Sequence, residues 1–232
     1  MRLDLRSIRA LALVVWAGVF TWLWATGESV RYLGPRTQWV VPVGALGLTL
    51  AAAAYLFVTR REEPIRIGLR EGLGLGALLL PVLAAAVLAN AQLGALAASN
   101  KLSSRGIDAS ALARLAGKNA KQIGFLQLNA AGRDDGLTRE LGLSEGRSVE
   151  LVGFVSEEGR PFTLSRFYIT CCVADAVPIG VHVMPRGQAK LKRDDWVDVT
   201  GVLSKGHREW VVRALAIRHI KPPSDPYLSF AG

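Results

Sequence analysis

Residues 37–59 read TQWVVPVGALGLTLAAAAYLFVT and contain no charged side chain. A membrane-spanning helix needs about 17 to 25 mostly apolar residues, so this stretch is long enough to cross a bilayer. Trp39 and Tyr55 lie toward its two ends, and aromatic side chains favour the two membrane–water interfaces. The stretch therefore predicts a transmembrane helix.

Two further uncharged stretches flank this one. Residues 10–27 read ALALVVWAGVFTWLWATG, and residues 73–92 read LGLGALLLPVLAAAVLANAQ. The first lies where a signal peptide would, but Trp22 and Trp24 keep it bulky to its end, so we expect a retained span. The second contains Pro81, which a membrane helix tolerates when neighbouring helices pack closely. The sequence thus predicts three transmembrane helices.

The arginines around these stretches predict how the chain is oriented. Two segments are rich in arginine: the flank before the first span has Arg2, Arg6 and Arg9, and the loop between the second and third spans has Arg60, Arg61, Arg66 and Arg70. The loop between the first and second spans has only Arg31 and Arg36. Positively charged flanks favour the cytoplasmic side. We therefore expect a multi-pass protein of the cell membrane with a cytoplasmic N terminus and an extracytoplasmic C-terminal domain.

The chain is basic, with 28 Lys and Arg against 19 Asp and Glu, a formal net charge of +9. In a soluble protein this excess would suggest nucleic acid as a partner. Lys190, Lys192 and Arg193 beside Trp196 would also suit single-stranded nucleic acid in a cytoplasmic domain. Because the predicted orientation removes that partner, we expect the bilayer as a partner and no nucleic acid. A cytoplasmic domain that binds nucleic acid or peptide is the alternative if the orientation is reversed.

From residue 148 onward the composition changes to runs of β-branched and aromatic residues separated by turn residues, which is typical of strands. Five strands are predicted, at residues 148–156, 162–170, 177–184, 195–204 and 209–220. Residues 188–193 have helical character, and this order of elements is that of a small five-stranded OB-like barrel. Gly153 and Gly201 fall inside predicted strands, where such a barrel bends.

The predicted fold is therefore a helical membrane region followed by an all-β domain. Its parts are a three-span transmembrane region at residues 1–95, a connector with short helices at 96–147, the OB-like β-barrel domain at 148–222 and a tail at 223–232. Within the connector, short helices are expected at residues 109–115 and 134–141, the second with acidic residues at its start.

Cys171 and Cys172 are the only cysteines, and their adjacency excludes a disulfide framework. Cysteines are soft ligands for copper(I) or zinc, and His182 or His207 would complete such a site. Neighbouring side chains on a strand point to opposite faces, so the two thiols share an ion only if the strand ends or bulges there. Free cysteine commonly behaves as a small buried hydrophobe, which favours a place in the core. A strained disulfide between the two neighbours is a further alternative.

Residues 166–180, RFYITCCVADAVPIG, resemble the YcgQ-like family of permease subunits, as do residues 196–201, WVDVTG, and residues 220–227, IKPPSDPY. The resemblance implies spans at the N terminus, a small C-terminal β domain and a separate multi-spanning permease as partner. Some relatives carry a histidine-rich loop between the second and third spans, which implies a link to metal ions. Residues 60–70 of this chain contain no histidine.

Arg166 and Asp175 both lie in the string that carries the resemblance. An arginine fork that fixes a turn carboxylate is a common structural device. An aspartate after a strand also commonly accepts hydrogen bonds from turn amides. Ligand binding by this pair is the alternative interpretation.

The sequence carries no Walker loop, no G-x-S-x-G elbow and no H-E-x-x-H pattern. The predicted spans also lack the acidic and histidine residues that relay ions through a membrane. We therefore expect no enzyme and no resident cofactor, but an accessory subunit of a two-component permease, with a link to metal or metalloid transport. The alternative is a membrane-anchored thiol protein that uses Cys171 and Cys172 for metal binding or redox exchange.

Overall fold

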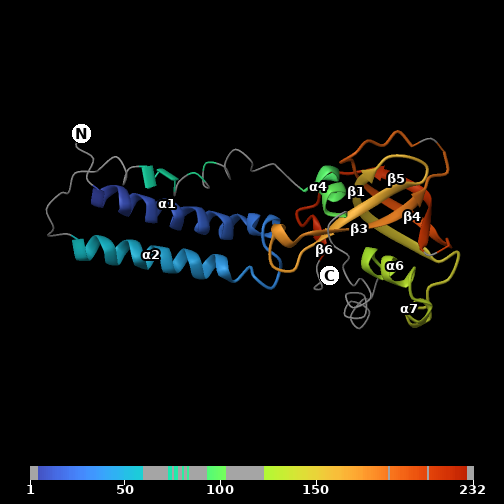
Figure 1. Ribbon diagram of the computed structural model, residues 1–232, viewed down its shortest axis with the longest axis horizontal. Coiled ribbons are helices and arrows are strands. Elements are labelled where there is room, and N and C mark those ends of the chain that lie inside the picture. Colours follow the sequence, from blue (N-terminus) through green and yellow to red (C-terminus); the bar gives the residue numbers. More distant parts are fainter. Residues whose placement is uncertain are drawn as a thin grey trace. The chain divides into compact units, whose positions relative to one another are not determined.

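The computed structural model describes residues 5–59, 93–102, 123–187, 189–207 and 209–228, together with Leu73, Gly74, Gly76, Ala77, Leu80 and Leu83. The chain divides into two compact units, Met1–Gln92 and Leu93–Gly232. The first unit contains the apolar helices and the second contains the sheet (Figure 1).

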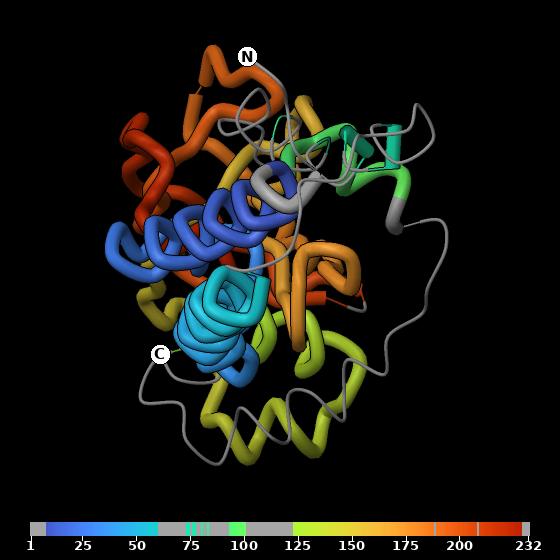
Figure 2. The backbone as a smooth tube through the Cα atoms, turned by 90° about the vertical axis from the view of Figure 1, so that its left-hand side faces the viewer, coloured from blue at the N-terminus to red at the C-terminus, as the bar shows by residue number. Residues whose placement is uncertain are grey.

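The first unit is built on two long helices, α1 (Leu5–Thr26) and α2 (Val40–Val58), joined through the short 3-10 helix η1 (Glu28–Arg31). The two long helices lie side by side (Figure 2). Both are long and apolar enough to cross a membrane, over Ile8–Thr26 and Val40–Val58. Two of the three predicted spans are therefore present as helices.

The third predicted span, residues 73–92, lies largely outside the described residues. Its described members are few but all helical: Leu73, Gly74, Gly76, Ala77, Leu80 and Leu83.

Small side chains are buried in this pair of helices, and bulky ones face outward. The buried apolar residues of α1 and α2 are Ala10, Ala12, Ala17, Val41, Ala45 and Ala52. A Cβ added to Gly44 would lie 2.7 Å from the ring of Phe20, so a larger residue at this position would push the helices apart. The exposed large residues include Leu11, Trp22, Trp39, Leu46, Leu50 and Phe57.

Hydroxyl side chains within these helices bond to their own backbone. Thr21, Thr49 and Thr59 each donate to the carbonyl four residues earlier, at 2.7 to 2.8 Å. This back-bonding satisfies a polar side chain inside an apolar segment. The threonines are thus compatible with a helix surrounded by lipid or by other helices.

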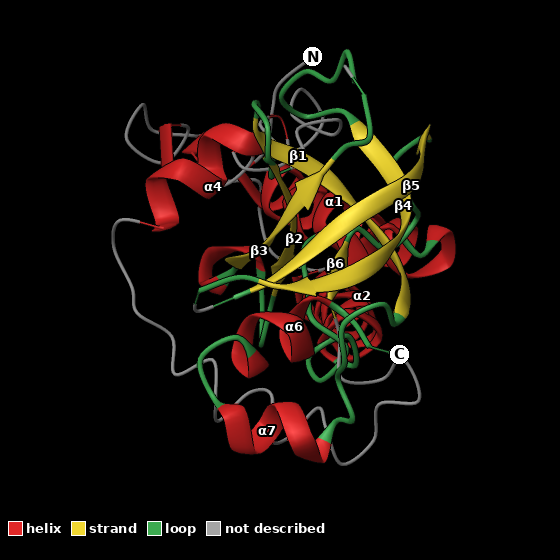
Figure 3. Ribbon diagram, turned by 90° about the vertical axis from the view of Figure 1, so that its right-hand side faces the viewer, coloured by secondary structure: helices red, strands yellow, loops and turns green. Residues whose placement is uncertain are grey.

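The second unit is a six-stranded sheet (Figure 3). Its strands are β1 (Ser148–Glu157), β2 (Phe162–Tyr168), β3 (Val177–Met184), β4 (Trp196–Lys205), β5 (Trp210–His219) and β6 (Tyr227–Leu228). The five predicted strands are confirmed. The sixth lies in what the sequence suggested was a tail.

Strand pairing forms a closed cycle. The sheet order is β1-β4-β5-β3-β2-β6, and β1 also pairs with β2. Within this cycle each of the first five strands pairs with two others, and all of these pairings are antiparallel except that of β3 with β5. β6 runs parallel to β2, with Phe167 opposite Tyr227.

The main core lies between these strands and the short helices α6 (Phe125–Ala131) and α7 (Asp135–Glu140). Among its buried members are Phe125, Leu128, Leu164, Val183, Val199 and Val212. α6 lies between α7 and the strands (Figure 3). The predicted helix at residues 134–141 is confirmed as α7, whose N-cap Asp134 accepts hydrogen bonds from Gly136 and Leu137.

A second, smaller cluster packs under α4 (Ala95–Leu102). The rings of Phe154 and Phe167 are stacked, with their centroids 5.4 Å apart. The ring of Trp196 is tilted relative to that of Phe154, with the centroids 5.8 Å apart. The N terminus of α4 is held by Asp194, whose Oδ1 accepts a hydrogen bond from the amide of Ala95 at 2.5 Å. Parts of the expected connector therefore pack against the sheet.

Two predictions of helices have different outcomes. The helix expected at residues 188–193 is wrong, because residues 189–193 form no helix and lead into a turn in which Asp194 has φ 69°. Ala189 and Leu191 are the apolar residues of this stretch, and two residues apart they do not share a helix face, so there is no stripe that would hold a helix against the core. The helix expected at residues 109–115 lies outside the described residues.

Gly153 and Gly201 lie where neighbouring backbone comes too close for a side chain. A Cβ on Gly153 would lie 2.7 Å from the carbonyl oxygen of Ser165, and one on Gly201 would lie 2.6 Å from that of Arg213. Gly201 also borders an irregularity in the pairing of β4 with β5. The close approaches explain why glycine is needed inside these two strands.

Replacing Gly153 or Gly201 by alanine is expected to lower the free energy of unfolding by about 1 to 3 kcal/mol, since overpacking against backbone has that typical cost. Thermal unfolding of the detergent-solubilised chain, followed by the circular dichroism of the sheet, measures the loss. Gly187→Ala is the matched control, because nothing lies within 4 Å of its added Cβ. Equal melting temperatures for all three variants would contradict the prediction.

Candidate functional site

The adjacent cysteines lie in a short turn, residues 170–176, which we name the thiol turn. β2 ends at Tyr168 and β3 begins at Val177, with the 3-10 helix η3 (Val173–Asp175) between them. The strand has therefore ended before the cysteines, which is the condition for two neighbouring side chains to approach each other. Cys172 has an extended backbone and precedes η3.

Asp175 organises the thiol turn. Its Oδ1 accepts a hydrogen bond from the amide of Thr170 at 3.1 Å, and its Oδ2 accepts one from the amide of Cys171 at 2.8 Å. The amide of Asp175 in turn donates to the carbonyl of Cys172 at 3.0 Å. The expectation that this aspartate bonds turn amides agrees with these contacts, which fix the backbone on both sides of the thiols.

The two thiols are accessible and close together. Cys171 is exposed and Cys172 is half-buried, and neither forms a disulfide. The Sγ of Cys171 lies 3.8 Å from the Sγ of Cys172. The expectation that both cysteines lie in the core is therefore wrong for Cys171, which lies beyond the end of β2 and is exposed among the described residues.

The carboxylate of Asp175 raises the pKa of the Cys171 thiol to about 11, through a hydrogen bond that stabilises the protonated form, and the neighbouring Cys172 thiol adds to this effect. Desolvation alone would raise the pKa of Asp175. Hydrogen bonds from the Cys171 thiol and from the amides of Cys171, Thr170 and Cys172 outweigh it, so this pKa lies below its ordinary value. The turn thus pairs a proton-bearing thiol with an ionised carboxylate.

Arg166 holds the last strand rather than the thiol turn. Its Nη2 donates to the carbonyl of Asp225 at 2.6 Å, and its Nε donates to that of Pro226 at 3.3 Å. Burial lowers the pKa of Arg166, an effect partly offset by the Asp225 carboxylate. The structure therefore gives Arg166 and Asp175 separate partners instead of the expected fork.

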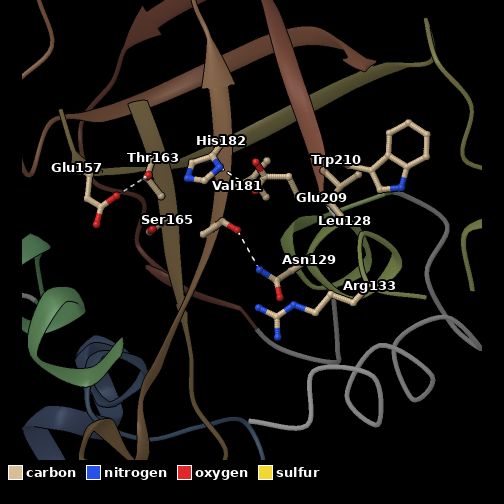
Figure 4. Close-up of a pocket in the computed structure, with 11 residues that line it drawn as sticks. Leu128, Asn129, Arg133, Glu157, Thr163, Ser165, Val181, His182, Glu209 and Trp210 are labelled. Atoms are coloured by element: carbon tan, nitrogen blue, oxygen red, sulfur yellow. Dashed lines mark hydrogen bonds and ion pairs between the residues drawn. The ribbon is translucent and has the colours of Figure 1, made fainter. Parts of the chain in front are cut away.

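His182 lines a pocket of about 240 Å³ between α6 and strands β2 and β3 (Figure 4). Its Nδ1 lies 2.8 Å from Oε2 of Glu209. Thr163, the cross-strand partner of His182, donates to Glu157 at 2.9 Å, and Asn129 of α6 donates to the carbonyl of Gly180 at 3.1 Å.

Arg133 also borders this pocket, with its guanidinium beside Asn129 (Figure 4). The pocket therefore offers both charges, together with donors and acceptors, to a small polar molecule.

The structure does not bring His182 together with the cysteines. His182 is paired with Thr163 near the start of β2, whereas the thiol turn follows Tyr168 at the end of that strand. The five steps from Thr163 to Tyr168 span about 16 Å at the usual rise of a strand. Among the residues that the structure describes, no three His, Cys, Asp or Glu side chains are grouped to hold a metal ion.

Sequence reasoning did not find the pocket or the contact of Arg166 with the last strand. One signal was present: polar Thr163 lies between buried Phe162 and Leu164, which places its side chain on the opposite face of β2. The approach of α6 and Glu209 to that face is a tertiary contact that no local pattern records.

The comparison with known families covers the sheet. Residues 135–229 match the family model described as the DUF1980 C-terminal domain. The match includes all six strands and the thiol turn, and it is consistent with the YcgQ-like resemblance of residues 166–180. No curated protein matches the chain.

The rate at which iodoacetamide alkylates Cys171 is expected to rise with pH, with a midpoint near pH 11. The thiolate is the nucleophile, so a raised pKa slows the reaction of the thiol at neutral pH. Asp175→Asn removes the carboxylate and should move the midpoint down toward the ordinary value of a thiol. Mass spectrometry of the peptide that contains Cys171 measures the rate at each pH.

Glu140→Gln is the matched control, because it removes one exposed carboxylate elsewhere in the same unit. It should leave the midpoint unchanged. A midpoint in the wild-type chain near that of a free thiol would show that Asp175 does not act on Cys171.

Proposed function

We propose that the chain is a non-enzymatic accessory subunit of a two-component membrane permease. In this proposal three spans anchor it in the cell membrane beside a multi-spanning partner. Its C-terminal domain, an OB-like barrel, lies outside the cytoplasm and binds or presents what the permease moves. The cargo class is a metal or metalloid.

The observation that carries this proposal is the distribution of side chains on α1 and α2. Bulky apolar groups such as Trp22, Leu46 and Phe57 are exposed, while the buried positions are occupied by alanine and valine. Close packing through small residues, with large apolar groups outside, suits helices that lie in lipid or against other membrane helices. Neither α2 nor residues 10–26 of α1 contain an acidic or histidine side chain that could relay ions, which favours docking over conduction.

The strand pairings support the proposed OB-like class. Five strands pair in a closed cycle with β3 parallel to β5, an arrangement compatible with a small five-stranded barrel. Domains of that class bind ligands on an outer face between loops. The pocket beside His182 lies on such a face, between β2, β3 and α6.

The second candidate function is a membrane-anchored thiol protein that uses Cys171 and Cys172 for metal binding or redox exchange. The exposed position of Cys171, 3.8 Å from the neighbouring sulfur, favours it. In this alternative the helices serve only as an anchor, and the thiols work without a partner protein.

Affinity purification from native membranes in mild detergent tests the leading proposal. The tagged full-length chain is expected to recover one multi-spanning protein in a fixed ratio, identified by mass spectrometry. An unrelated tagged membrane protein of similar hydropathy, carried through the same steps, is the control. If both baits recover the same proteins, the chain is no stable subunit and the thiol protein becomes the better assignment.

The orientation is tested with a single introduced thiol. In a chain carrying Cys171→Ser and Cys172→Ser, the exposed Ser144 is replaced by cysteine. A membrane-impermeant maleimide added to intact cells is expected to label this chain, because the C-terminal domain is proposed to lie outside. The parent without cysteines is the control. Labelling that requires permeabilised cells would place the domain in the cytoplasm.

A further inference from the structure

We infer that Cys171 and Cys172 together capture a soft divalent cation of the zinc type, held by two thiolates and open to further ligands. In the permease such a site captures the cargo, so the inference deepens the proposed function and rests on it. The binding of the ion by the chain itself does not require the partner.

The separation of the two sulfurs fits such an ion. Zinc binds thiolate sulfur at about 2.3 Å with tetrahedral geometry, which places two sulfurs of one site about 3.8 Å apart. The Sγ atoms of Cys171 and Cys172 are 3.8 Å apart in the thiol turn. The two side chains therefore need little rearrangement to hold one ion between them.

The turn is built to keep this geometry. The carboxylate of Asp175 accepts from the amides of Thr170 and Cys171, and its own amide donates to the carbonyl of Cys172. These three bonds fix the backbone on both sides of each thiol. Hydrogen-bonding groups behind the ligands orient them for the metal, and Asp175 is the positioning residue here.

The charges also suit a divalent cation. When both thiols lose their protons, two thiolates and the Asp175 carboxylate lie within one short turn. A divalent cation offsets this repulsion, and soft thiolate ligands select ions such as zinc over magnesium or calcium. In the reaction two S–H bonds break, two metal–sulfur bonds form and two protons pass to solvent, with no change of oxidation state.

Two protein ligands leave the ion partly uncoordinated. No group of three potential ligands occurs among the described residues, and Cys171 is exposed. Structural zinc sites are closed by four protein ligands, whereas open positions admit water or an incoming ligand. The arrangement thus suits an ion that is received and passed on rather than one that is kept.

The test uses the reduced full-length chain in detergent, without partner, and Cd²⁺ as the probe, since its thiolate complexes absorb in the ultraviolet. One Cd²⁺ per chain is expected to bind, with release of two protons and protection of both thiols from iodoacetamide. Zn²⁺ should displace it. Because these readouts need no substitution, they hold even where a variant fails to fold.

Variants then assign the site. Cys171→Ser and Cys172→Ser are each expected to weaken Cd²⁺ binding by at least about 100-fold, since removal of a ligand costs no less than removal of an outer-shell partner, for which losses of about 10- to 100-fold are usual. Glu140→Gln should bind as the wild type does. Circular dichroism checks that the sheet is retained in each variant.

Cd²⁺ binding that persists in the chain carrying both serines, or thiols that stay reactive with Cd²⁺ present, would overturn the inference. So would a chain isolated without reductant that contains a disulfide in place of free thiols. If Cd²⁺ does not bind while a multi-spanning partner is recovered, the metal site is refuted but the assignment as a permease subunit is kept. If Cd²⁺ binds and no partner is recovered, the metal site is kept and the assignment as a permease subunit is refuted.

Discussion

The second unit depends on β1 pairing along both of its edges. β1 pairs with β4 over Ser148–Phe154 and with β2 from Phe154 onward, so one strand joins the two ends of the cycle. The change of partner is possible because Gly153 lets the carbonyl of Ser165 approach and because the register shifts between Val155 and Glu157. A bulge of this kind bends a strand and increases its twist. Without it, β2 would have no fixed place beside β1.

The thiol turn and the pocket occupy opposite ends of β2. The pocket uses Thr163 and Ser165 near the start of the strand, and the thiol turn follows Tyr168. The two sites therefore share a scaffold but no side chain. One offers oxygen and nitrogen groups of both charges, whereas the other offers sulfur, so they differ in the chemistry of the ligand that each can accept.

Much of this architecture could be predicted from the sequence, for physical reasons. The five longer strands are rich in β-branched and aromatic residues and are bounded by turn residues, and the uncharged stretches of α1 and α2 meet the length needed to cross a bilayer.

The failures have equally specific causes. β6 contains only Tyr227 and Leu228, too few residues to show a period, and the helix expected at 188–193 had propensity without an apolar face. The burial of Cys171 was judged from residue type, whereas its exposure follows from where β2 ends.

Arg166 and β6 also limit how other proteins can meet this domain. One edge of β2 pairs with β3 along its length, and the other is shared by β1 over Thr163–Ser165 and by β6 over Phe167–Tyr168. Arg166, between these two contacts, bonds the chain that leads into β6. Along its described length β2 therefore presents no open edge for β-augmentation. A protein that adds a strand to this sheet must therefore do so at a strand other than β2, the strand that leads into the cysteines.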